Sequence, residues 1–110
     1  MRNLAYWTCS AALAVGSVAF AGGPQKTGDA VKGKEVFEQC SVCHNSDSDE
    51  KKMGPGLKGL FKKAKMASGK APTDANVAAK INEGGGGMPA YSDILTDSEK
   101  ADLLAYLKTL

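Results

Sequence analysis

The chain has 110 residues, with 14 basic and 12 acidic side chains that leave a formal net charge of +2. This length is enough for one small domain and excludes a multidomain protein. Only four aromatic residues lie beyond residue 21, and so short a chain has difficulty burying enough apolar surface to offset its conformational entropy. The composition therefore indicates that a large apolar cofactor completes the core.

Residues 1–21 have the pattern of a cleaved signal peptide. A basic start precedes an uncharged run over residues 4–21, which ends in Ala19-Phe20-Ala21. Small residues at these two positions suit a signal peptidase. The alternative is an uncleaved membrane anchor, because the run approaches the length that spans a bilayer. Polar residues within the run and the well-formed cleavage site favour export to the periplasm and removal of the leader.

The domain proper is predicted over residues 29–110, behind a flexible lead-in at 22–28 that contains glycine and proline. Its first helix starts at Asp29, a residue type that caps helices, and runs to about Gln39. Small or apolar side chains recur at helical spacing along this stretch. The polar residues 45–50 then predict a loop.

Three more helices are predicted farther along the chain. A short one covers residues 57–64, and the next is capped by Thr73 or Asp74 and stops at Gly84. The last begins at a reciprocal capping box over residues 96–99 and carries a buried apolar stripe. No alternating strand pattern of useful length occurs in the sequence. The predicted class is all-α, with about four short helices and long loops.

Cys40-Ser41-Val42-Cys43-His44 is the motif that carries chemistry. Two cysteines three residues apart on a helical turn lie on one face, with Cβ atoms about 5–6 Å apart. That separation suits thioether bonds to two vinyl groups of one haem, and the histidine that follows points its imidazole at the iron. The motif is typical of c-type haem attachment. Export agrees, since this attachment is usually made outside the cytoplasm.

Three other uses of the cysteine pair fit less well. A thioredoxin-like redox pair needs a βαβ scaffold, which the sequence does not predict. A structural zinc site needs four Cys or His ligands, and only three lie beyond residue 21. A plain short-loop disulfide leaves His44 unexplained.

The second iron ligand has to come from another residue type, because His44 is the only histidine. Lysine is normally protonated, which leaves Met53, Met66 and Met88. Met53 lies beside the cysteine motif and Met66 follows a lysine-rich segment, so both are expected to pack or to face solvent. Met88 follows four glycines, which let the chain wrap closely, and precedes Pro89, which stiffens it. Met88 is therefore the predicted ligand.

With these features the chain resembles the small bacterial class I cytochromes c, of the type with a single haem. The resemblance runs from about Gly28 to the C-terminus. The residues that carry it are Gly33 and Phe37, the motif at residues 40–44, Gly54-Pro55-Gly56-Leu57, Met88-Pro89-Ala90-Tyr91, and Tyr106-Leu107.

The resemblance implies the class I cytochrome c fold, wrapped around one covalent haem. It implies that the first and last helices cross at Gly33, where a side chain would hold them apart. It also implies that the carbonyl of Pro55 accepts a hydrogen bond from the His44 ring, which fixes the ring plane. Leu57 and Leu60 are expected to pack against the porphyrin.

Ligation by His44 and Met88 would fill every position on the iron and leave none for a substrate. The expected function is one-electron transfer by a soluble, monomeric carrier that shuttles electrons between redox partners, and not enzymatic catalysis. The alternative is a haem domain that binds or senses small ligands, or a peroxidase-like protein. In either alternative the sixth position is open or Met88 is easily displaced.

Lysines are concentrated in residues 51–70, which hold seven lysines and no acidic residue. One interpretation is a solvated face with no partner. The other is a basic rim that steers the protein to an acidic redox partner. Nucleic acid is not an expected partner, because the protein is expected to be exported and the lysines lack interleaved aromatic residues.

Overall fold

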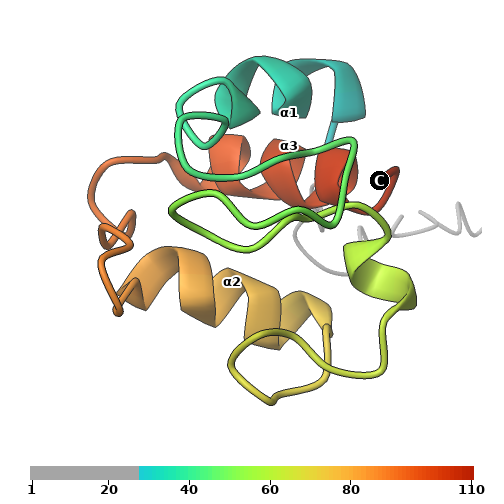
Figure 1. Cartoon of the computed structure of the whole chain (residues 1–110). Coiled ribbons are helices and arrows are strands. Elements are labelled where there is room, and N and C mark those ends of the chain that lie inside the picture. The colour runs from blue at the N-terminus through green and yellow to red at the C-terminus, as the bar shows by residue number, and fades with distance from the viewer. Residues whose placement is uncertain (1–27) are drawn as a thin grey trace, which may run out of the picture.

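Three α-helices and one short 3-10 helix, joined by long loops, make up the computed structural model, which describes residues 28–110 (Figure 1). They are α1 (Ala30–Phe37), η1 (Leu60–Lys62), α2 (Asp74–Glu83) and α3 (Asp97–Leu107). No strand occurs within the described residues, which confirms the all-α class. The predicted signal peptide, residues 1–21, lies outside them, as do residues 22–27 of the lead-in.

The helices start where the sequence supplies a cap. The carboxylate of Asp29 accepts hydrogen bonds from the first backbone N–H groups of α1, and the Thr73 hydroxyl does the same for α2. Thr96 and Glu99 form the complete capping box of α3. The start of each α-helix is therefore fixed by a side chain that was recognisable in the sequence.

The helices α1 and α3 pack closely against each other, whereas α2 makes much less contact with α3 (Figure 1). Gly33 lies at the crossing, where an added Cβ would be 1.9 Å from the carbonyl oxygen of Asp102. One turn along, the rings of Phe37 and Tyr106 are 5.3 Å apart between centroids. The crossing at Gly33 is therefore present as expected, and it holds one side of the molecule together.

The second predicted helix is the element that differs. A helix was expected over residues 57–64, but only the three-residue 3-10 helix η1 forms there. Gly59 precedes it in the left-handed region at φ 66°, and Lys63 after it is extended, so neither neighbour continues a helix. The first helix is also shorter than predicted, since α1 ends at Phe37 and the chain continues in turns.

The buried core is small. In Figure 1 the helices α1 and α3 lie together on one side and α2 lies on the other, with the chain of residues 40–60 passing between them. Among residues 28–110, no helix is both long and apolar enough to cross a bilayer. The buried apolar residues are Phe37, Leu60, Val77, Ile81, Leu95, Leu103 and Leu107.

Candidate functional site

The two cysteines and the histidine lie on one tight turn that follows α1, here called the attachment turn (residues 40–44). The Cys43 N–H donates to the Cys40 carbonyl at 3.1 Å, and the His44 N–H donates to the same oxygen at 2.9 Å. These bonds have helical spacing, so all three side chains are presented from one turn of backbone. Both thiols are half-buried. The structure therefore brings together the three residues of the predicted attachment motif.

The ionisation of nearby groups shows which segment faces the thiols. Burial raises the pKa of the Cys40 thiol, and the neighbouring Cys43 adds to the increase. Burial is also the main cause of a raised pKa at the Tyr91 hydroxyl, with further increases from Cys40 and Cys43. Tyr91 therefore lies near the attachment turn, although it is far away in the sequence. It belongs to the segment that also carries Met88.

The imidazole of His44 is held by the segment of residues 53–57, here called the clasp. The carbonyl oxygen of Pro55 lies 2.8 Å from His44 Nδ1. Since a carbonyl only accepts, Nδ1 carries the proton and Nε2 has the lone pair that can bind a metal. Gly54 packs against the same ring, where an added Cβ would be 2.4 Å from His44 Cε1. The Pro55 contact expected from the resemblance is present.

The rest of the clasp brings apolar groups beside the turn. The Leu57 N–H donates to the Asn45 carbonyl at 2.8 Å, and its half-buried side chain packs against the core beside the buried Leu60. Met53 is 79% exposed, and its sulfur lies 4.0 Å from the sulfur of Cys43. The packing of Leu57 and Leu60 against the porphyrin therefore stays a prediction, whereas Met53 faces solvent as expected.

Met88 is presented by a sharply folded loop, here called the methionine loop (residues 84–91). The glycines from Gly84 to Gly87 all have positive φ, between 63° and 110°. Gly85 and Met88 pair in both directions, through an N–H···O bond of 2.9 Å and another of 3.2 Å. An added Cβ at Gly84 would be 2.4 Å from the Met88 carbonyl oxygen. Only glycine can make this approach, and it turns Met88 back toward the helices.

The far end of the methionine loop is tied to α2. The Tyr91 N–H donates to the carbonyl of Ile81 at 2.9 Å, so the loop leaves α2 and returns to it. The Met88 side chain is half-buried and packs against the core. Sequence reasoning gave Tyr91 no role of its own. Tyr91 lies near the thiols because the loop folds back onto α2, and no motif in the sequence predicts this fold.

Burial alone does not select one methionine. Met66 is also half-buried and packs against the core. Met66 lies in a turn closed by its own N–H on the Lys70 carbonyl at 2.8 Å, among exposed lysines. Met88 differs because its loop also carries Tyr91, which lies near the thiols. This neighbourhood, together with the glycine turn, favours Met88.

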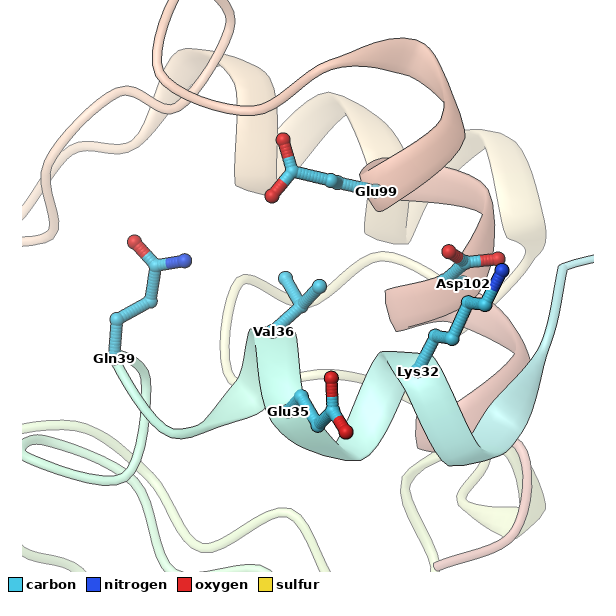
Figure 2. Close-up of a pocket in the computed structure, with 6 residues that line it drawn as sticks. All are labelled: Lys32, Glu35, Val36, Gln39, Glu99 and Asp102. Carbon is cyan, nitrogen blue, oxygen red and sulfur yellow. The ribbon is translucent and has the colours of Figure 1, made fainter.

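A hollow of about 400 Å³ lies elsewhere, on the outer surface of α1 and α3 (Figure 2). Charged and polar side chains dominate it, and two of its carboxylates serve the fold. Glu99 accepts from the Thr96 N–H at 3.1 Å, and Asp102 accepts from the Asp29 N–H at 2.8 Å. None of the predicted haem residues lines it. The lining residues are Lys32, Glu35, Val36, Gln39, Glu99 and Asp102.

The donor set near the attachment turn fits a c-type haem. Two thiols on one turn match two thioether bonds, and His44 presents one ring nitrogen while Pro55 holds the other. Gly54 leaves room beside that ring, and Leu57 supplies an apolar contact surface. Within residues 28–110 no cluster of three or more His, Cys, Asp or Glu side chains is arranged to hold a metal ion.

Sequence comparisons point to one family. A profile described as cytochrome c matches residues 30–110. Cytochrome c6 of Leptolyngbya boryana is 34% identical over 80 residues, which cover 72% of this chain and 89% of that protein. Cytochrome c2 of Blastochloris viridis is 30% identical over 102 residues, which cover 77% of this chain and 80% of that protein.

A solved structure agrees with the sequence comparisons. Cytochrome c6 from the diatom Phaeodactylum tricornutum matches with a TM-score of 0.58 at 26% identity, and the match covers 74% of this chain and 93% of the diatom chain. The fold is that of the class I cytochromes c. The chain therefore belongs to the cytochrome c family, and it is an electron carrier whose cofactor is one covalent c-type haem with iron.

Proposed function

We propose that Cys40 and Cys43 hold the haem through thioether bonds, and that His44 and Met88 are the two axial ligands of its iron. The protein would then be an exported, diffusible carrier of single electrons. The observation that carries this proposal is the 2.8 Å contact between His44 Nδ1 and the Pro55 carbonyl, directly after the cysteine pair. It orients the one histidine of the chain as a metal ligand needs to be oriented.

Each residue has a physical task in this proposal. The haem, when bound, supplies reversible one-electron chemistry at its iron. Pro55 fixes the tautomer of His44, so that Nε2 is always the nitrogen with the lone pair. Gly54 and Leu57 hold the ring and the apolar surroundings in place. A fixed surrounding suits electron transfer, because little structure has to rearrange when the charge changes.

Met88 decides between a carrier and an open-iron protein. A thioether is a soft ligand that favours ferrous iron and raises the reduction potential. With Met88 in the sixth position, no site remains for a substrate or a diatomic ligand, which argues against sensing and peroxidase chemistry. The half-buried position of Met88 on a tightly turned loop supports the closed form.

The proposal also covers the redox partner and the cellular location. We expect a periplasmic protein that meets an acidic redox partner through the lysines of residues 51–70. All seven of these lysines are exposed. Exposed charges act over about 8 Å at physiological ionic strength, so electron transfer through such a face slows as salt is added.

The test of closed coordination is Met88→Ala in the haem-bearing protein. We expect a lower reduction potential, loss of the weak long-wavelength absorption band that reports a methionine sulfur on ferric haem, and rapid binding of carbon monoxide by the ferrous protein. Met53→Ala and Met66→Ala are the matched controls and should keep all three properties. Unchanged spectra in Met88→Ala would reject Met88 as the ligand. Loss of the band in Met66→Ala would assign the role to Met66.

A further inference from the structure

Lys80 contacts the methionine loop from the last turn of α2. Its ammonium Nζ is 3.1 Å from the carbonyl oxygen of Gly84 and 3.4 Å from that of Gly85. The side chain is half-buried. The first contact lies within the usual range for an N–H···O bond and the second is longer. One ammonium therefore reaches the first two carbonyls after the helix.

These two carbonyls belong to the groups that close the turn on Met88. The Gly84 carbonyl shares a peptide unit with the Gly85 N–H, which donates to the Met88 carbonyl at 2.9 Å. The Gly85 carbonyl also accepts from the Met88 N–H at 3.2 Å. Both hydrogen bonds of the turn thus run through peptide groups that Lys80 contacts. Hydrogen bonds in such a chain polarise and strengthen one another.

The loop needs an anchor of this kind. Glycine loses more conformational freedom on ordering than any other residue, and four glycines in a row precede Met88. A cation beside the last carbonyls of a helix is also favoured by the helix dipole. Lys80 supplies both the charge and the donors at the point where the loop leaves α2.

We propose that Lys80 is a positioning residue, which clamps the glycine turn so that Met88 stays on the iron. This inference rests on the proposed ligand role of Met88. Lys80 itself does not have to approach the haem, because it acts through the peptide groups of Gly84 and Gly85.

Lys100 provides the matched control within the same loop region. Its ammonium donates to the Ser92 carbonyl at 2.9 Å, just beyond Tyr91. It is a lysine on a helix that donates to a loop carbonyl, like Lys80, but it is not connected to the turn at Gly85 and Met88. Changing it removes the same charge without touching the proposed clamp.

The experiment compares Lys80→Leu and Lys100→Leu in the full haem-bearing protein. Leucine keeps an apolar stem without adding a sulfur or nitrogen that could bind iron. The probe is imidazole at a pH above its own pKa, where the neutral form that binds iron predominates, so that loss of a nearby positive charge does not itself change its binding. Imidazole occupies the sixth position only when Met88 leaves it. We expect Lys80→Leu to bind imidazole roughly tenfold more tightly, as loss of hydrogen bonds from a charged donor implies.

The second measurement is hydrogen exchange at the Gly85 and Met88 amides, which should be about tenfold faster in Lys80→Leu and unchanged in Lys100→Leu. If the leucine variant does not accumulate, Lys80→Gln replaces it, and imidazole affinity and amide exchange should change in the same directions. Unchanged imidazole affinity and exchange in the Lys80 variants would overturn the clamp. An equal change in Lys100→Leu would overturn it as well, because the effect would then be general.

The two proposals fail in different ways. If the wild-type protein lacks the methionine–iron band and Met88→Ala leaves imidazole affinity unchanged, the proposed ligand role of Met88 is wrong. Amide exchange at Gly85 and Met88 reports on opening of the turn itself, so in that case the comparison of the Lys80 and Lys100 variants still decides whether Lys80 clamps the turn.

Discussion

The attachment turn and the methionine loop carry the two proposed iron ligands but are built differently. In residues 40–44 the backbone keeps helical hydrogen bonds and the clasp closes over His44 from the side. In residues 84–91 the backbone turns through four glycines of positive φ, and the hydrogen bonds between Gly85 and Met88 close the turn. The attachment turn therefore keeps a helix-like backbone, whereas the methionine loop needs four glycines, which lose the most conformational freedom on ordering. Any exchange of iron ligands should begin at the methionine loop.

The largest expected effect comes from a substitution in the attachment turn. Cys43→Ala removes one proposed thioether and should weaken or abolish stable haem attachment. We expect the free energy of unfolding to fall, because a protein that loses its haem also loses the apolar group that completes its core. Mass spectrometry measures the haem content, and urea unfolding measures the stability.

Val42→Ala is the control for this prediction, since Val42 lies on the same turn and is 71% exposed. It should keep the haem and lose little stability. A Cys43→Ala product that folds without haem would contradict the view that the cofactor completes the core.

A smaller effect is expected from a substitution in the methionine loop, which should leave the haem attached. Gly84→Ala places a Cβ 2.4 Å from the Met88 carbonyl oxygen, on a residue with φ 65° and ψ −144°. We expect the free energy of unfolding to fall by about 2 kcal/mol and the methionine–iron absorption band to weaken, while the haem content stays complete. Absorption spectroscopy and urea unfolding check both parts.

Gly86→Ala separates backbone strain from the steric clash. Gly86 has φ 63°, but an added Cβ there meets nothing within 4 Å. Gly86→Ala should lower the free energy of unfolding by only about 1 kcal/mol and keep the methionine–iron band. Equal loss of the band in both variants would mean that the close approach at Gly84 does not hold Met88.

The smallest expected effect concerns an ion pair near the attachment turn. Asp49 and Lys63 form an ion pair of 2.7 Å, which ties the loop after His44 to the end of η1. The hydrogen bond from Lys63 is the main reason that the pKa of Asp49 lies below its ordinary value of 3.8. A lowered pKa means that the pair stabilises the fold above about pH 4 and that this contribution is lost as the pH falls through the folded pKa.

Asp49→Asn should therefore slightly reduce stability at neutral pH and make acid unfolding less steep below pH 4. Both side chains are exposed, so added salt should remove most of the difference. Thermal unfolding from pH 3 to pH 7, at low and high salt, measures it. A difference that survives high salt would point to a role other than charge pairing.

The sequence predicted the chemistry of the attachment turn better than the geometry of the methionine loop. Cys40, Cys43 and His44 are adjacent, so their meeting on one turn needs no tertiary information. The caps Asp29 and Thr96 are equally local, and both were predicted correctly. The position of Tyr91 near the thiols and the reach of Lys80 depend on how a glycine loop folds back, which local propensity does not encode. For the same reason the predicted helix at 57–64 shortened to η1, because Gly59 adopts a left-handed conformation.

Within residues 28–110, three lysines donate to loop carbonyls and therefore help to shape the backbone. Lys52 contacts the Ser41 carbonyl at 3.2 Å, Lys80 contacts that of Gly84, and Lys100 contacts that of Ser92. Chemical acetylation, a common way to map where a basic protein meets its partner, removes the charge from every lysine that it reaches. At Lys52 such labelling would disturb the attachment turn, and a slower reaction would be mistaken for a lost docking contact. Lys62 and Lys65 are exposed and make no such carbonyl contact, so labelling at these positions tests docking without disturbing the backbone.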